Sequence, residues 1–520
     1  MDFNLSQEFT SELPGDPIEI NSRRQVEKAC YSFVSPTVPS GPSLVHVSPE
    51  MLDVLGIPQS FSTSDEFLSY FSGQSVYPES RPYAMAYGGH QFGLWAGQLG
   101  DGRAINIMDI RARDKKWSLQ LKGSGATPYS RTADGLAVLR SSVREHLCSE
   151  AMHHLGVPTT RSLSLCLTGD QVLRDVMYDG NSAYEKGAVV CRAAESFLRF
   201  GNYQLFASRG DKTNLTTLLD YTIRHHFPKI KSEGSTAYAE LFQAVTQRTL
   251  DMILHWQRVG FVHGVMNTDN MSILGLTIDF GPYGWLEGYD KGWTPNTTDR
   301  QQKRYQYGNQ PSIALWNLAQ LGNVINYITE DPSPLQETIE WYKRQFEQEY
   351  VKMMSTKVGL TQVIDDTKQL INSLESALIE VETDMTIFFR LLADCTSSAS
   401  FEECWSIIQP SFYAKDINLQ AQEIWKDWFS KYQQQLLLEN RNDEDRKKEM
   451  NTLNPKYVLR NYMAQLAIDK ADQGDYSLIG ELYNCLKRPY EEQAVYQHWF
   501  AKRPEWARHK VGCSMLSCSS

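Results

Sequence analysis

The sequence predicts an α+β fold with two lobes. Short strand-like runs separated by glycine-rich turns fill the region from about 80 to 205, which also contains one strongly amphipathic helix. From about 206 onward the patterns are mostly helical, and a compact polar segment at 261–290 interrupts them. Strands followed by helices, rather than alternating with them, are typical of α+β proteins. Because ligands commonly bind between two lobes, we expect a binding site there.

Composition excludes several classes of protein. The 520 residues are 41% hydrophobic and 22% charged, which is typical of a globular chain with a large core. The net charge of −11 argues against general nucleic-acid binding. The sequence has no run of about 18 apolar residues that would predict a membrane span, and its acidic N-terminus matches neither a signal nor a transit peptide. We therefore expect a monomer without nucleic-acid or membrane partners, cytoplasmic if the source is bacterial.

The N-terminal part of the chain divides into an extension and the first lobe. Residues 1–79 are rich in Pro and Ser, so we expect an irregular extension packed on the core. The first lobe follows at 80–205. Within it, residues 104–110 and 117–123 alternate apolar and polar side chains, as half-buried strands do. The intervening residues 111–116 are polar, which predicts a hairpin loop.

One helix of the first lobe is predicted by an apolar stripe at every fourth position. The stripe consists of Leu139, Val143, Leu147, Ala151 and Leu155. Asp134 is a suitable N-cap, and Gly156 followed by Pro158 predicts the end of the helix. We expect the second lobe at 206–330 and a helical C-terminal region at 331–520.

A glycine-spaced turn stands directly before the first predicted strand. Gly100 and Gly102 flank an aspartate, and Arg103 follows. Such a turn lets backbone N–H groups approach phosphate oxygens without obstruction by side chains. An ordinary hairpin turn would explain the same residues.

A lysine and a glutamate follow this turn in an informative order. Lys122 ends the second predicted strand, and Glu145 lies in the striped helix, off its apolar face. A strand lysine held by a helix glutamate is the phosphate-orienting pair of kinase-like N-lobes. The alternative is a surface ion pair, which contributes no more than about 1 kcal/mol.

The polar segment at 261–290 resembles a kinase catalytic loop followed by its metal-binding motif. His263, Asn270 and Asp279 keep the kinase order, and Asp279 begins an Asp-Phe-Gly triplet. The position of the general base holds Val265, which cannot accept a proton, but an acid stands at Asp269. An Asn amide and an Asp carboxylate supply the oxygen ligands that Mg²⁺ prefers. These motifs indicate nucleotide binding and leave both a catalyst and a pseudokinase scaffold open.

Four longer segments and the last three residues of the sequence resemble the selenoprotein O family, the YdiU-type kinase-like protein adenylyltransferases. The segments are GGHQFGLWAGQLGDGRA, LKGSGATPYSRTADGLAVLRSSVREHL, HGVMNTDNMSILGLTIDFGPYGWLE, NPKYVLRNYMAQ and the terminal CSS. The resemblance runs from about residue 80 to the C-terminus. It implies a protein-kinase-like two-lobed fold with an N-terminal extension and a helical C-terminal extension.

The resemblance also implies a reaction. Members transfer AMP from ATP to Ser, Thr or Tyr hydroxyls of proteins and release pyrophosphate, using Mg²⁺ or Mn²⁺. The nucleotide lies flipped relative to protein kinases, so a base at Val265 would serve no purpose. Redox-related proteins are among the expected acceptors.

By the same resemblance, individual residues receive roles in the site. Asp269 accepts the proton, and Asn270 and Asp279 bind the metal ion. Lys122, positioned by Glu145, holds phosphate. The remaining nucleotide contacts are Gly100, Gly102, Arg103, Asp134, Gly135, Arg192, Arg199 and Asp279. For the two arginines, a surface charge is the alternative interpretation.

Cys518 sits where many eukaryotic members of the family carry selenocysteine, which implies a redox or regulatory role. Two positions depart from the family pattern: Thr297 replaces a histidine, and Pro295 stands where some bacterial members place a cysteine near the site. A disulfide of Cys518 with that position is therefore excluded, whereas Cys513 or another thiol could substitute.

We predict a protein adenylyltransferase. A kinase that transfers the γ-phosphate is the nearest alternative, and the absence of an acid at Val265 argues against it. A nucleotide-binding scaffold without catalysis is the third interpretation. Transfer assays with labelled ATP distinguish the three.

Overall fold

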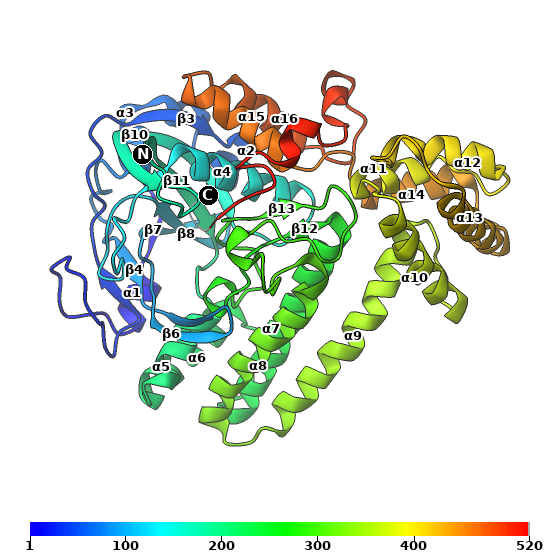
Figure 1. Cartoon of the computed structure of the whole chain (residues 1–520). Helices are drawn as coiled ribbons and strands as arrows, with labels where there is room; N and C mark the ends of the chain where they lie inside the picture. Colours follow the sequence, from blue (N-terminus) through cyan, green and yellow to red (C-terminus); the bar gives the residue numbers. More distant parts are fainter. Residues whose placement is uncertain (518–520) are drawn as a thin grey trace.

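The computed structural model describes residues 1–517 and contains two lobes with a helical module beside them (Figure 1). The first lobe is built on a nine-stranded sheet whose paired strands are antiparallel. The predicted α+β class is therefore confirmed. The main path of the sheet is β2 (Tyr31–Phe33), β4 (Tyr83–Met85), β7 (Ala104–Ala112), β8 (Lys115–Lys122), β11 (Ser182–Ala194), β10 (Arg161–Asp175) and β3 (Ser43–Val47).

Strands β7 and β8 form the predicted hairpin. Arg113 and Asp114 make its turn with φ of 48° and 62°, and two positive φ angles suit a two-residue hairpin loop. The strands are more deeply buried than predicted, since every residue from 104 to 110 is buried. Ile107 packs in one apolar cluster and Ile105 in another, so β7 contributes to two parts of the core.

Residues 1–79 are only partly irregular and contain more regular structure than predicted. They add β1 (Leu5–Ser6), β2 and β3 to the sheet by pairing with β7, β4 and β10. Helices α2 (Pro49–Val54) and α3 (Asp65–Ser72) then cover one face of the sheet with buried side chains such as Phe67 and Phe71. The N-terminal segment is thus part of the core of the first lobe.

Helix α4 (Leu139–His154) covers the other side of the sheet. All five residues of the predicted stripe are buried. The predicted N-cap is wrong, because Val138 is the N-cap residue of α4. Asp134 lies four residues before it, and its carboxylate accepts a hydrogen bond from Arg174 instead. Helices α15 (Asn461–Asp472) and α16 (Ser477–Leu486) pack on α4 from the solvent side, so the C-terminal region braces the first lobe (Figure 1).

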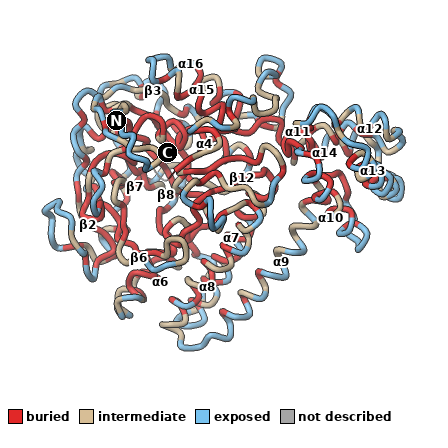
Figure 2. The backbone as a smooth tube through the Cα atoms, in the orientation of Figure 1, coloured by how far each residue is buried: buried red, intermediate tan, exposed pale blue. Residues whose placement is uncertain are grey.

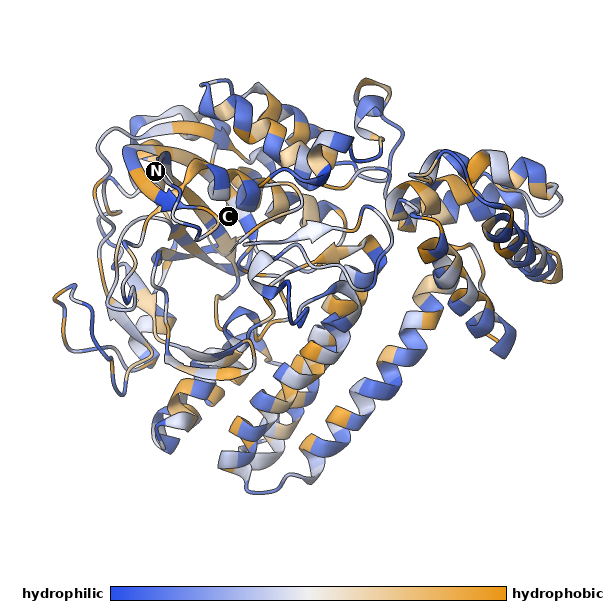
Figure 3. Ribbon diagram, in the orientation of Figure 1, coloured by the Kyte–Doolittle hydropathy of each residue, from blue (hydrophilic) through white to orange (hydrophobic). Residues whose placement is uncertain are grey.

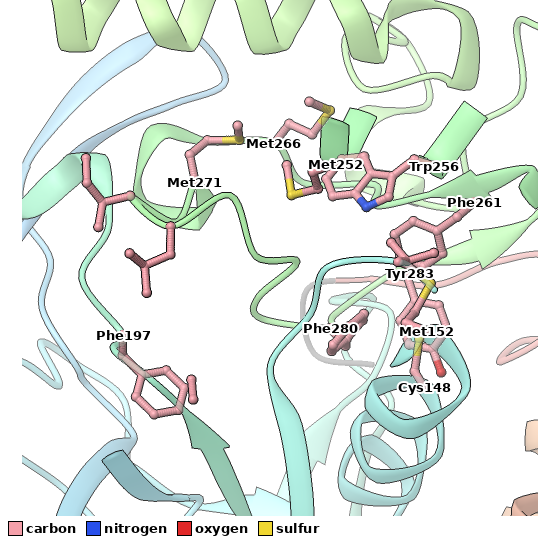
Figure 4. Packing of buried hydrophobic residues seen from close by; sticks show 14 of the residues in the cluster. Cys148, Met152, Phe197, Met252, Trp256, Phe261, Met266, Met271, Phe280 and Tyr283 are labelled. Atoms are coloured by element: carbon pink, nitrogen blue, oxygen red, sulfur yellow. The ribbon is translucent and has the colours of Figure 1, made fainter. Parts of the chain in front are cut away.

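The second lobe consists of long helices around a short loop region. Its helices are α5 (Phe200–Ser208), α6 (Lys212–His226), α7 (Gly234–Val259), α8 (Gln310–Thr329) and α9 (Ser333–Lys357). Strands β12 (Phe261–Val262) and β13 (Gly284–Trp285) bracket the polar motif segment. Aromatic packing anchors this segment: Phe261 lies between Trp256 and Tyr283, with ring centroids 5.6 and 5.9 Å away (Figure 4). The catalytic-loop motif is therefore held in place by packing against the hydrophobic core.

A separate apolar cluster holds the module beside the lobes together. The module comprises α10 (Asp365–Glu380), α11 (Met385–Leu392), α12 (Phe401–Ile408), α13 (Leu419–Glu439) and α14 (Asp443–Leu453). Trp425 and Trp428 are fully buried in it. Helix α9 leads into the module with a largely hydrophilic, partly exposed surface, as Figures 2 and 3 show. Within the described residues, no helix is long and apolar enough to cross a membrane.

Candidate active site

A cleft of about 750 Å³ lies between the two lobes, and most of the predicted site residues line it. Glu145 and Arg199 lie behind its wall, in contact with residues that face it. The predicted residues in the lining are Gly100, Gly102, Arg103, Lys122, Asp134, Gly135, Arg192, Asp269, Asn270 and Asp279. Residues as far apart in the sequence as Gly100 and Asp279 are thus brought together at one site.

Three cations converge on Asp279. Its carboxylate accepts hydrogen bonds from Arg192 Nη1 at 2.6 Å and Arg199 Nη1 at 2.5 Å, and Lys122 Nζ lies 3.6 Å away. Burial alone would raise the pKa of Asp279, but Arg199, Arg192 and Lys122 hold it well below its ordinary value. Asp279 also adopts φ of 57°, a left-handed conformation that costs a non-glycine residue free energy and often marks functional sites. The three cations therefore keep the Asp279 side chain ionised at the wall of the cleft.

Glu145 anchors two of these cations from behind. Lys122 Nζ lies 2.6 Å from Glu145 Oε2, and Arg192 Nη1 lies 3.0 Å from Glu145 Oε1. Glu145 and Lys122 are both buried, so the surface-pair alternative does not describe them. Gln120 accepts a further hydrogen bond from Arg192. These acceptors hold the buried Arg192 guanidinium in one position at the cleft, where it is able to bind an anion.

Arg192 and Arg199 are interior residues, not surface charges. Each is 1% exposed, one on β11 and the other at the N-cap position of α5. Arg199 also donates to the backbone oxygen of Asp269 at 2.8 Å, and its guanidinium lies 4.5 Å from the ring centroid of Tyr87. These contacts tie the strand lobe to the catalytic loop.

Asp269 presents a buried carboxyl group to the cleft. Gln91 Nε2 donates to its Oδ2 at 3.4 Å, whereas Oδ1 is buried without a hydrogen-bond partner among the described residues. Burial, only partly offset by hydrogen bonds and by Arg199, raises the pKa of Asp269 to about 6. A carboxyl group with this pKa is suited to exchange protons near neutral pH.

A short hairpin to which the sequence analysis assigned no role covers Asp269. It consists of β5 (Gly88–Gln91) and β6 (Leu94–Gln98). The backbone N–H of His90 donates to Thr268 Oγ1 at 2.7 Å, and a Cβ atom on Gly89 would lie 2.7 Å from Asp269 Oδ1. Only glycine leaves room for the carboxylate here. The sequence carries no spacing signal for Gly89 or Gln91.

Asn270 and Asp279 offer two oxygen ligands. Asn270 Nδ2 donates to the backbone oxygen of Val265 at 2.9 Å, which fixes the amide and leaves its Oδ1 available. Among the described residues, no group of three or more His, Cys, Asp or Glu side chains could hold a metal ion by itself. This donor set suits Mg²⁺, which keeps several waters and binds through one or two protein oxygens plus substrate phosphates.

The glycine-spaced turn is held in shape by its neighbours. Gly100 has φ of 80°, and a Cβ atom there would meet the ring of Tyr129 at 2.4 Å. Asp101 between the glycines is buried, and its carboxylate accepts the N–H of Met85 at 3.0 Å. The turn therefore brings the backbone near Gly102 to the cleft in a fixed conformation.

Asp134 and Gly135 lie at the mouth of the cleft. Both oxygens of Asp134 accept hydrogen bonds from Arg174 at 2.8 Å, and Oδ1 also accepts the N–H of Leu136. A Cβ atom on Gly135 would lie 2.2 Å from the backbone of Gly125. No sequence pattern pointed to Arg174, which reaches the mouth from β10.

The C-terminal tail approaches the same mouth. Leu516 accepts hydrogen bonds from the N–H and hydroxyl of Thr297 at 2.8 and 2.9 Å and donates to Pro295 at 3.2 Å. Ser517 Oγ donates to the backbone oxygen of Val176. Cys518 lies outside the described residues. The eight described cysteines form no disulfide, and Cys513 is buried, which raises its pKa to about 11.

Comparison with known sequences agrees with this geometry. The family model "Protein adenylyltransferase SelO" matches residues 20–487. The predicted resemblance is thereby confirmed, and it begins well before residue 80. Three relatives share the name protein nucleotidyltransferase YdiU. The identity is 56% to that of Flavobacterium johnsoniae over 99% of both chains, 51% to that of Aromatoleum aromaticum over 99% of both, and 50% to that of Rhodopirellula baltica over 100% of this chain and 99% of the relative.

These matches extend over nearly the whole chain, and sequence identities of this size establish homology. They agree with the two-lobed architecture and with the kinase-like order of Lys122, Glu145 and Asp279 around one cleft. The chain belongs to the SelO family of kinase-like protein adenylyltransferases.

Proposed function

We propose that this chain transfers AMP from ATP to Ser, Thr or Tyr hydroxyls of proteins and releases pyrophosphate, in the presence of Mg²⁺. The observation that carries the proposal is the cluster of Lys122, Arg192 and Arg199 on Asp279, facing the same cleft as the proton-accepting candidate Asp269. The cations suit the negative charges of the ATP phosphates. The carboxyl group suits an acceptor hydroxyl, because it can take up the proton that the hydroxyl loses.

Charge neutralisation is the main contribution of the protein. Phosphoryl and nucleotidyl groups react through loose transition states that depend on positioning and on stabilised charge. Lys122 and the two arginines would bind phosphate oxygens, with Glu145 keeping Lys122 and Arg192 in place. Mg²⁺, or Mn²⁺ with the same oxygen preference, would neutralise further phosphate charge when held by Asn270 and Asp279.

Proton transfer would fall to Asp269. Its raised pKa, about 6, makes the carboxylate a stronger base than an exposed aspartate while leaving it ionised at neutral pH. Val265, at the position of the kinase base, is buried and has no acid or base function. This difference supports a flipped nucleotide whose α-phosphate, rather than the γ-phosphate, meets the acceptor hydroxyl.

Labelling with two forms of ATP tests the proposal. The purified chain is incubated with Mg²⁺ and α-labelled or γ-labelled ATP, first alone and then with proteins of a cell lysate as acceptors. We expect protein-bound label from the α position only. Asp279→Ala should reduce it at least about 100-fold, because the site loses a metal ligand and the partner of both arginines. Asp53→Ala, at an exposed aspartate on α2, is the control and should label normally.

Other outcomes would contradict the proposal. Label from the γ position would identify a kinase. Bound ATP without label from either position, on any acceptor protein, would identify a nucleotide-binding scaffold.

A further inference from the structure

Among the described residues that line the cleft, one aromatic ring is open to a ligand. Four aromatic residues line the cleft, and three are already engaged. Tyr87 and Tyr129 are buried, and Phe92 packs against Tyr305 with ring centroids 5.3 Å apart. Tyr178 is 62% exposed, and no aromatic or cationic side chain of the described residues stacks on its ring. Its ring is therefore free to stack on a flat partner inside the cleft.

Tyr178 sits on a structured hairpin tip. The tip joins β10 to β11, and Asp175 fixes it by accepting the N–H groups of Asp179 at 3.2 Å and Gly180 at 2.8 Å. Tyr178 itself has φ of 56°, where glycine would avoid strain. A strained tyrosine at an exposed tip adds nothing to packing, so its side chain is better explained by a contact with a ligand.

The surroundings of Tyr178 differ from those of the cations. Arg192 lies near the far end of the β10–β11 pair, whereas Tyr178 lies at its tip. The lining near the tip contains the apolar side chains of Ala133 and Leu136, and the guanidinium of Arg174 is held in a fixed orientation by Asp134. The cleft thus has buried cations at one end and an exposed aromatic ring beside Arg174 at the other.

We propose that Tyr178 is the base-stacking residue of the nucleotide site, with the nucleobase lying against its ring at the mouth of the cleft. The inference deepens the proposed function and rests on ATP binding in this cleft. Base–aromatic stacking contributes substantially to the affinity for each base and depends on the ring rather than on its hydroxyl group. Tyr178 therefore positions the adenosine end of the substrate while the arginines hold its phosphates.

Binding of two probes, one with a base and one without, tests this role. Dissociation constants of ATP and of inorganic tripolyphosphate are measured by calorimetry with Mg²⁺ present. We expect Tyr178→Ala to weaken ATP binding about tenfold and to leave tripolyphosphate binding unchanged. Tyr178→Phe should stay within about twofold of the wild type for both probes. Tyr184→Ala removes another exposed tyrosine of the same hairpin, one that is not among the residues lining the cleft, and this variant should bind both probes normally.

Comparing the affinities for ATP and for tripolyphosphate shows whether the stacking role, the proposed function or both are wrong. An unchanged ATP affinity in Tyr178→Ala would overturn the stacking role and leave the proposed function intact. Equal losses for both probes would assign Tyr178 to the shape of the loop and would also overturn it. If the wild type bound tripolyphosphate but not ATP, the proposed function would fail, and the stacking role with it.

Discussion

At the scale of single residues, the site depends on a few close approaches between backbone and side chain. The Asp269 carboxyl group is accommodated only because residue 89 has no side chain. Asp269 Oδ1, which has no hydrogen-bond partner among residues 1–517, lies against this position, so the hairpin and the carboxyl group restrict each other's place. Misplacing a reacting group by about 1 Å can reduce a rate about 100-fold.

Gly89→Ala should therefore reduce AMP transfer about 10- to 100-fold while the chain stays folded. The new Cβ atom would lie 2.7 Å from Asp269 Oδ1 and push the carboxyl group aside. The matched control is Gly41→Ala, because a Cβ atom there meets nothing within 4 Å. Transfer rates and urea unfolding are measured for both variants. Normal transfer by a folded Gly89→Ala variant would contradict this account of Asp269.

At the scale of elements, one buried ion pair connects the helical module to the rest of the chain. Asp384 caps α11 by accepting the N–H of Ile387 at 3.0 Å, and Arg460 binds both of its carboxylate oxygens at 2.7 and 2.9 Å. Both side chains are almost completely buried. Removing one partner of such a pair leaves an uncompensated buried charge.

Asp384→Asn should destabilise the chain by about 3–5 kcal/mol, since Arg460 would lose its counter-charge. The control is Asp427→Asn, whose partner Lys431 is exposed and whose ion pair contributes at most about 1 kcal/mol. Urea unfolding followed by circular dichroism gives both free energies. A difference between the variants of less than about 1 kcal/mol would show that the pair contributes little to holding the module.

The elements also show what the sequence could and could not predict. Helix α4 and strands β7 and β8 follow from their periodicity, and the order of Lys122, Glu145 and Asp279 follows from motif spacing. The short strands of the first 79 residues could not be predicted, because they owe their structure to partners far along the chain, as β3 does to β10. Gln91 and Arg174 were missed for the same reason.

At the scale of the whole molecule, buried neutral histidines couple stability to pH. Burial lowers the pKa of His46 to about 4 and that of His226 to about 3, and it lowers that of His146 well below the ordinary range. In the unfolded chain these groups titrate near 6.5. Between these values the unfolded state binds more protons than the folded state, so stability is complete above about pH 6.5 and declines as the pH falls toward 4.

We therefore expect the free energy of unfolding to fall between pH 7 and pH 5, by roughly 1–2 kcal/mol for each of these histidines. His226→Gln should make this slope shallower, whereas His498→Gln, at an exposed histidine, should not. Urea unfolding at a series of pH values measures the slope. An identical slope in wild type and His226→Gln would show that His226 is charged in the folded chain.

The position of the C-terminal tail affects how the protein can be handled. Leu516 and Ser517 lie against Pro295, Thr297 and Val176, and Val176 is two residues from Tyr178 at the mouth of the cleft. An affinity tag fused after Ser520 would begin a few residues beyond Ser517. Such a tag would lie close to the cleft that we propose for the nucleotide, so a tag at the other terminus suits an assay of the proposed transfer better.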